Sequence, residues 1–179
     1  AQSRALAVAA AARRQGGELA PLLAATDLQD PGPGLLPASA GLVTFDRQGN
    51  AVSCAFTMNN LFGTGRIAPS LGFLMAAAPG VGAVEPPLLS AAMVWAPNIR
   101  AFRLAAAGAG QAAAPMAVAA PMAAQLLREV PVSQAVGAAP NPGRTQLAAC
   151  TRYLPGWEEG CAAATDPRGG GVALGATDR

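Results

Sequence analysis

The stretch from residue 41 to residue 58 constrains the fold more than any other part of the chain, because it has the pattern of a β-hairpin. We predict a first strand at Gly41–Phe45 and a second at Ala51–Met58, where small polar and apolar residues alternate. The five residues between them read Asp-Arg-Gln-Gly-Asn, and glycine and asparagine suit the positive φ angles of a tight turn. The pattern therefore predicts two antiparallel strands.

Polar residues mark one end of this predicted hairpin. Ser39 lies just before the first strand, and Thr57 and Asn59 lie at the end of the second. In an antiparallel pair these two ends are neighbours, so a hydroxyl nucleophile and two polar partners can meet there. Each residue is equally compatible with an ordinary hydrogen bond at a strand end, and the pattern alone leaves both interpretations open.

The chain has no histidine, and this restricts the chemistry available to it. Ser-His-Asp and Cys-His catalysis are removed, together with the usual catalytic zinc ligands. No phosphate loop or dinucleotide fingerprint is present, so we expect no metal and no cofactor. A hydrolase built on this chain needs another base. A free α-amino group, with an unperturbed pKa of about 8, is the obvious candidate when it lies beside its own hydroxyl.

Charge and hydropathy limit the partners. The net charge is +2, from 12 scattered arginines and 10 acidic residues, which gives no electrostatic case for nucleic acid. No apolar run is long enough to predict a transmembrane segment. Hydrophobic residues make up 52% of the chain but aromatic residues only 4%. Small side chains bury little area each, so we expect a protein partner to contribute to stability.

The remaining pattern runs from strands to helices and back to strands, which predicts an α+β fold of packed layers. Helices are expected at residues 112–120 and 121–129, with Pro121 beginning the second. A short helix or strand is expected at 132–137. Further strands are expected at 93–97, 101–106, 145–152, 160–165 and 171–175, with a possible short strand at 73–75.

The sequence divides into three parts. Residues 1–26 are alanine-rich and predict helix, broken near Gly16-Gly17, and residues 27–38 form a Pro/Gly linker. Residues 39–179 form the main domain. A chain that begins Ala-Gln-Ser is compatible with the product of signal-peptide removal.

Cys150 and Cys161 flank ten residues that a disulfide would close into a loop, with a stabilisation of about 2–3 kcal/mol. The alternative is two free thiols on paired strands. A disulfide would place the protein in an oxidising compartment, the periplasm or the cell exterior. Cys54 is expected to be a small buried residue.

Three other side chains receive structural interpretations. Trp95 and Trp157 are expected in the core or in edge packing. Arg168 is expected to pair with Asp166 or a neighbour.

The segment from 39 to 65 resembles the start of the small subunit of gamma-glutamyltransferases. These are N-terminal-nucleophile (Ntn) hydrolases with an αββα sandwich. In that family, self-cleavage leaves a threonine at the new N-terminus, followed by a strand, an acidic turn ending Gly-Asn-Ala-Val-Ser, and a Thr-x-Asn-x-x-Phe-Gly-Ser/Thr-Gly segment. Here the corresponding stretches are 49–53 and 57–65, and Asp166-Pro167-Arg168-Gly169-Gly170-Gly171 resembles the family's closing strands. The resemblance covers roughly residues 37 to 175 and implies a partial αββα sandwich with a mostly antiparallel sheet.

The resemblance also implies roles for individual residues. Counting back from the Gly-Asn-Ala-Val-Ser motif puts the nucleophile at Ser39, so cleavage would fall between Ala38 and Ser39. Thr57 matches the threonine that assists it, and Asn59 matches a substrate-binding asparagine. The Pro-Leu-Leu-Ser stretch resembles a substrate loop and implies Ser90. The Ala-Gly-Ala-Gly-Gln stretch resembles the oxyanion loop and implies Gly110.

Two functions follow from this comparison. The first is amide hydrolysis or acyl transfer on a small amide or peptide, with Ser39 as nucleophile. The second is a catalytically inactive accessory or structural subunit of a larger assembly. The second is motivated by departures from the family pattern: residues 75–82 contain no acid, Leu89 replaces a serine, and only 38 residues precede Ser39. Both functions imply a protein partner, either the large-subunit half or a larger complex.

Overall fold

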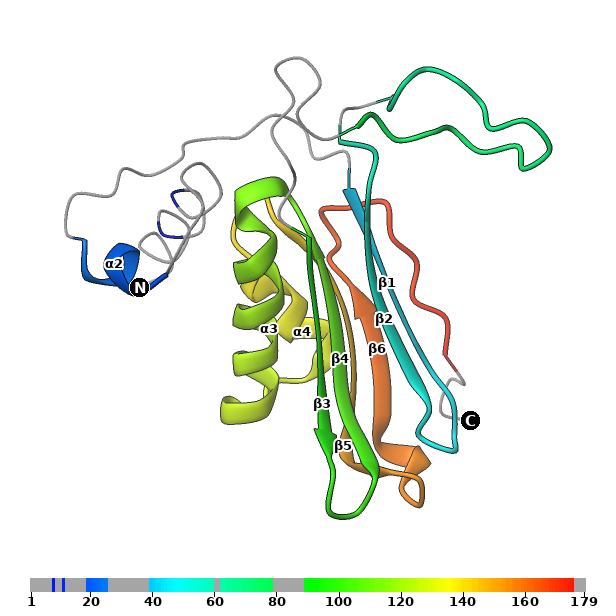
Figure 1. Ribbon diagram of the computed structural model, residues 1–179. Coiled ribbons are helices and arrows are strands. Elements are labelled where there is room, and N and C mark those ends of the chain that lie inside the picture. The colour runs from blue at the N-terminus through cyan, green and yellow to red at the C-terminus, as the bar shows by residue number, and fades with distance from the viewer. Residues whose placement is uncertain are drawn as a thin grey trace.

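The computed structural model describes residues 8, 11, 19–25, 39–59, 62–78 and 89–175. Within them, two antiparallel sheets and one helical layer form an α+β fold (Figure 1). The helices are α2 (Leu19–Ala24), α3 (Ala114–Arg128) and α4 (Val132–Ala135), with short 3₁₀ turns at Gln111–Ala113, Val136–Ala138 and Glu158–Gly160. The strands are β1 (Ser39–Phe45), β2 (Ala51–Thr57), β3 (Ser90–Ala96), β4 (Ala101–Ala109), β5 (Arg144–Leu154) and β6 (Cys161–Thr165).

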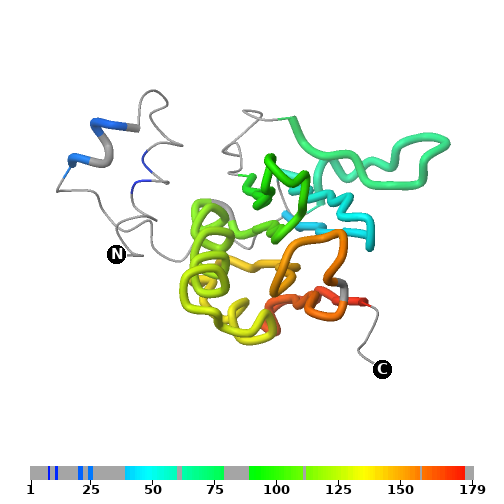
Figure 2. The backbone as a smooth tube through the Cα atoms, turned by 90° about the horizontal axis from the view of Figure 1, so that it is seen from below, coloured from blue at the N-terminus to red at the C-terminus, as the bar shows by residue number. Residues whose placement is uncertain are grey.

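The described domain has three layers. The four-stranded sheet, in the order β3-β4-β5-β6, lies in the middle. Helices α3 and α4 cover one face of it, and the β1–β2 hairpin covers the other (Figure 2). These layers are the α, β and β layers of the expected αββα sandwich. Residues 62–78 leave the end of β2 and project away from both sheets (Figure 1).

The hairpin forms with the predicted strands and turn. Its register pairs Ser39 with Thr57 at one end and Phe45 with Ala51 at the other. The Asp46 carboxylate accepts hydrogen bonds from the backbone N–H of Asn50 at 2.9 Å and from its side-chain amide at 2.8 Å. These two bonds close the turn. The sequence placed Ser39 just before β1, whereas it is the first residue of that strand.

The core lies on both faces of β4, where every residue except Arg103 is buried. Leu104 and Ala106 pack toward α3, while Phe102 and Ala105 pack toward the hairpin. Small residues let the layers approach closely. A Cβ atom added to Gly41 on β1 would lie 2.7 Å from the Ala107 Cβ, so only glycine fits there without movement.

Two expectations were wrong. Pro121 begins no helix but lies inside α3, which runs unbroken from Ala114 to Arg128. The proline ring is fully buried, and tertiary packing outweighs the roughly 3 kcal/mol by which proline disfavours a helix interior. Residues 171–175 form no strand and are exposed. Of the two positions left open for Trp95 and Trp157, the core is excluded, because they are 46% and 55% exposed, and Trp95 lies on the edge strand β3.

Smaller differences concern local structure. Residues 132–137, left open between helix and strand, are helical. Only Leu74 of the possible strand at 73–75 pairs, in an isolated bridge with Ile67. Cys54 is free and half-buried. The break expected near Gly16-Gly17 and the linker at 27–38 lie outside the described residues.

The predicted disulfide is present. Cys150 and Cys161 are directly opposite each other on β5 and β6 and are bonded. We expect the double variant Cys150→Ala/Cys161→Ala to lose about 3 kcal/mol of unfolding free energy, because the open loop gains entropy in the unfolded chain. Urea unfolding measures this, with Cys54→Ala as the control that removes an unbonded sulfur. Equal stability of the two proteins would contradict a structural role for the bond.

Asp166 and Arg168 form the predicted pair just after β6. Asp166 is almost completely buried, and its carboxylate accepts hydrogen bonds from the Arg168 backbone N–H at 2.9 Å and from Nε at 2.8 Å. The same guanidinium donates to the carbonyl of Ala139, which joins this turn to the segment after α4. Burial by itself would raise the pKa of Asp166, but the hydrogen bonds and charge of Arg168 outweigh it and hold the pKa below its usual value.

This lowered pKa predicts an acid-dependent loss of stability. The ionised carboxylate stabilises the fold above the unfolded pKa of about 3.9, and that contribution disappears as the pH falls through the lower folded value. We expect Asp166→Asn to cost about 2 kcal/mol at pH 7 and to flatten the decline in unfolding free energy below pH 4. Urea unfolding from pH 7 to pH 2.5 checks this, with the exposed Glu159→Gln as control. An unchanged acid limb would refute it.

Candidate active site

The candidate site lies at the end of the hairpin where β1 begins and β2 ends. Ser39 and Thr57 are paired in the antiparallel register, so the predicted nucleophile and its assisting threonine lie on adjacent strands. This closeness follows from the turn at residues 46–50, because the turn fixes the register and the register fixes which residues face each other.

Gly110 joins the site from the other sheet. It directly follows β4, and its backbone N–H donates a hydrogen bond to Ser39 Oγ at 3.3 Å, across 71 residues of sequence. Its φ angle is +119°, and an added Cβ would lie 2.6 Å from the Gly143 Cα. Glycine is therefore required at this position both by backbone conformation and by space.

Asn59 lies next to Thr57 and is 8% exposed. Its backbone N–H donates to Thr57 Oγ1 at 2.9 Å, and its side-chain amide donates to the carbonyl of Ala77. Its φ angle is +64°, which is uncommon for a residue other than glycine. Among the described residues, the side-chain oxygen Oδ1 is buried without a hydrogen-bond partner. That oxygen can accept a hydrogen bond from a bound N–H or O–H group.

Ser90 is the first residue of β3 and pairs with Gly108 on β4, two residues before Gly110. It therefore lies at the same end of the four-stranded sheet as Gly110, although the register does not bring it to Ser39. Leu89, where the family pattern has a serine, is 48% exposed. Within the site, the Gly110 N–H contacts Ser39 Oγ and the Asn59 N–H contacts Thr57 Oγ1, while Ser90 begins β3.

Solved structures share the fold that carries these residues. The chain aligns with a gamma-glutamyltranspeptidase from Pseudomonas nitroreducens complexed with L-DON at a TM-score of 0.56 and 20% identity. The match covers 75% of this chain and 97% of that one. A mutant gamma-glutamyltranspeptidase from Helicobacter pylori aligns at a TM-score of 0.52 and 16% identity, covering 72% and 99%. The fold is gamma-glutamyltranspeptidase-like.

No protein-family model matches the chain, and no curated protein matches it by sequence. The likeness therefore rests on the three-dimensional arrangement. It covers about three quarters of the chain, an extent similar to the sequence resemblance over roughly residues 37 to 175.

One polar residue near the site was missed as a functional candidate. Gln146 on β5 had been assigned only to a closing strand, yet its side chain reaches the hairpin. A Cβ added to Gly41 would lie 2.4 Å from Gln146 Oε1, and that oxygen is buried without a hydrogen-bond partner among the described residues. Gly41 is two residues from Ser39. The only sequence signal for Gln146 was its position in the strand predicted at residues 145–152.

The predicted site residues are uncharged, which limits what they can do. A hydroxyl, a backbone N–H and amide oxygens can attack a carbonyl and bind the resulting negative oxygen. They cannot take up the hydroxyl proton at neutral pH. Proton transfer therefore requires a group other than these side chains.

Proposed function

We propose that the chain is a gamma-glutamyltransferase-like amidohydrolase or acyltransferase with Ser39 as its nucleophile. The observation that carries this proposal is the hydrogen bond from the Gly110 N–H to Ser39 Oγ, formed between two sheets in a gamma-glutamyltranspeptidase-like fold. A backbone donor beside a candidate nucleophile is the arrangement that an acyl-transfer reaction uses to hold its oxyanion. The match of Ser39 to the family's cleavage position adds support from the sequence.

The proposed reaction begins with cleavage between Ala38 and Ser39, which frees the α-amino group of Ser39. Ser39 Oγ then attacks the amide carbonyl carbon, and its proton passes to that amino group, helped by Thr57. The Gly110 N–H donates to the oxyanion. When the C–N bond breaks, the leaving amine takes the proton and an ester remains on Ser39. Water hydrolyses the ester, or an acceptor amine takes the acyl group.

The substrate in this proposal is a small amide or peptide and need not carry a γ-glutamyl group. Residues 75–82, where the family binds the substrate's α-amino group, contain no acidic residue. Among the described residues, Asn59 Oδ1 is a buried acceptor without a hydrogen-bond partner. One acceptor suits an uncharged N–H or O–H group better than an ammonium, which needs several acceptors or an anion.

A second candidate is a non-catalytic subunit that keeps this fold within a larger assembly. The outer face of the hairpin favours it, because Leu42, Val52 and Phe56 there are each about half exposed (49%, 48% and 52%). An exposed apolar face of this kind is typical of a protein–protein interface. The same face supports a partner, either the large-subunit half or a larger complex, for the catalytic candidate as well.

We also propose a periplasmic or extracellular location, after removal of a signal peptide. The disulfide between Cys150 and Cys161 supports it, because such bonds persist in oxidising compartments. Among the described residues, no helix has the length and apolar character needed to cross a membrane.

The role of the α-amino group provides the test. We expect amide turnover to rise with pH and to level off above an apparent pKa near 8, since only the neutral amine accepts a proton. The chain contains no lysine, so an amine-acetylating reagent modifies only its N-termini. Acetylation after cleavage should abolish turnover. Turnover that survives complete acetylation, or that is independent of pH between 6 and 9, would contradict the proposed base.

A further inference from the structure

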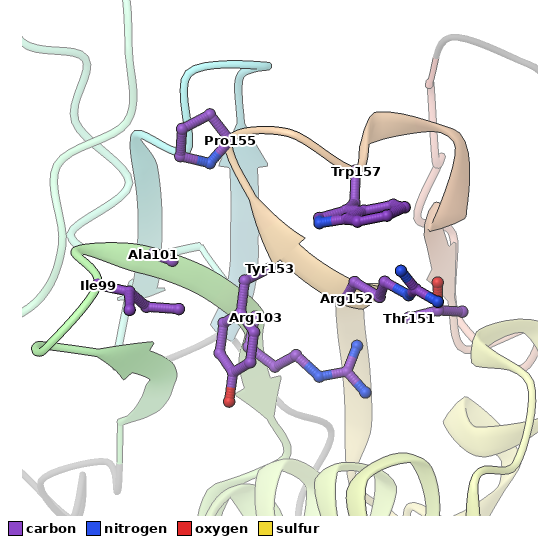
Figure 3. Close-up of a pocket in the computed structure, with 8 residues that line it drawn as sticks. All are labelled: Ile99, Ala101, Arg103, Thr151, Arg152, Tyr153, Pro155 and Trp157. Atoms are coloured by element: carbon purple, nitrogen blue, oxygen red, sulfur yellow. The ribbon is translucent and has the colours of Figure 1, made fainter.

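A pocket of about 500 Å³ lies at the end of the four-stranded sheet where the β3–β4 turn is (Figure 3). Gly110, which contacts Ser39, follows the other end of β4. It is formed by the β3–β4 turn, the start of β4, and the segment from Thr151 to Trp157 at the end of β5. Arg103 of this pocket is seven residues before Gly110 along β4, a distance of about 23 Å at the usual rise of about 3.3 Å per residue. Its volume is in the range of small-molecule sites.

Two arginines give the pocket a positive charge. Arg103 is the one residue of β4 that is not buried, yet its Nη1 atom is buried and has no hydrogen-bond partner among the described residues. The guanidinium of Arg152 lies over the ring of Trp157, 4.0 Å from the ring centre. Of the eight described residues that line the pocket, none is acidic. The charge therefore has no counterion within the lining.

The unpartnered Arg103 nitrogen indicates what kind of group is missing. A buried donor without an acceptor is costly, and an anion that accepts its hydrogen bond removes that cost. Arginine binds carboxylate and phosphate in preference to single-atom acceptors, because its planar fork matches two oxygens at once. The stacking on Trp157 restrains the second guanidinium, so less entropy is lost when it binds.

Apart from Thr151, the rest of the lining is apolar or aromatic. Tyr153 lies beside Arg103, Trp157 lies over Arg152, and Ile99 and Pro155 complete the apolar lining (Figure 3). Ile99 and Trp157 are more than half exposed, and contact with an apolar ligand would remove their surface from water. An inorganic anion gains no binding energy from these apolar walls. An anionic group attached to an apolar body does gain binding energy from them.

We propose that this pocket binds a small organic carboxylate, in which Arg103 and Arg152 hold the carboxylate and the surrounding side chains hold an aromatic or apolar body. This second site is separate from the Ser39 chemistry and does not depend on it. Binding of this ligand is therefore expected whether the chain is an enzyme or an accessory subunit.

NMR of the two tryptophan indole N–H groups in the full chain tests this proposal, with Trp95→Phe used to assign the Trp157 signal. We expect benzoate to shift the Trp157 signal saturably at millimolar concentration or below. The uncharged isostere benzamide and inorganic phosphate should each bind at least about tenfold more weakly. Equal binding of benzamide would overturn the role of the arginines, and equal binding of phosphate would overturn the role of the apolar walls.

Charge-removing variants locate the site. Arg103→Met and Arg152→Met should each weaken benzoate binding at least about tenfold, the loss expected for one charged hydrogen bond. Arg66→Met removes the same charge from the exposed segment 62–78 and should leave the dissociation constant unchanged. Because Arg152 is exposed, its variant remains informative if Arg103→Met fails to fold. Unchanged binding in Arg152→Met, or no saturable shift in the parent chain, would overturn the proposal.

Discussion

Ser39→Ala is expected to leave the chain as one uncut polypeptide and to lower amide turnover by about 10⁴-fold or more, the loss typical of a missing nucleophile. Without Oγ, neither self-cleavage nor attack on a substrate can occur. The α-amino group that we propose as the base also stays locked in a peptide bond. Intact-mass spectrometry and an amide hydrolysis assay on the same sample measure the two effects together.

The matched control for this experiment is Ser133→Ala. Ser133 is exposed on α4, which covers the face of the central sheet away from the hairpin. It loses the same hydroxyl, so cleavage and turnover should remain at the parent level. The nucleophile assignment is wrong if Ser39→Ala and Ser133→Ala behave alike. It is also wrong if Ser39→Ala is still cut at the same bond.

Phe102→Ala should produce the largest loss of stability, about 4 kcal/mol of unfolding free energy. Phe102 is fully buried and stacks on Phe45 of the hairpin, with 5.4 Å between ring centres. Its truncation would leave a cavity between the two sheets, next to Leu154 and Cys150. For a domain whose total stability is about 5–15 kcal/mol, this is a large share.

Phe56→Ala is the control, because it removes the same ring from a half-exposed position on β2. It should change the unfolding free energy by about 0.5 kcal/mol. Urea unfolding of both variants measures the difference. Similar losses in both would mean that the two sheets do not share the core described here.

The hairpin and its site end were predictable because local rules determine them. The Gly-Asn turn sets the register, and the register alone brings Ser39 opposite Thr57. The contact between Ser39 and Gly110 was different. It joins residues 71 positions apart, and only the resemblance to gamma-glutamyltransferases indicated it, because no local pattern relates the two sheets.

The features that the sequence did not predict have a common cause, because local sequence patterns do not determine how the layers pack against each other. Proline usually begins a helix, but Pro121 is accommodated in the interior of α3 by burial against the sheet. The sequence also left Trp157 open between the core and edge packing, although tryptophan is usually well buried. It lies at the rim of a pocket, with Arg152 stacked on it. That pocket was not predicted, because its residues come from two separate segments.

An intact-mass spectrum of the purified wild-type protein, recorded without and with reductant, tests the central proposal most directly. Self-processing predicts two fragments that join at Ala38–Ser39. The larger fragment should gain two hydrogens on reduction, because Cys150 and Cys161 both lie within it. A single uncut mass would contradict the Ser39 nucleophile and favour the non-catalytic subunit.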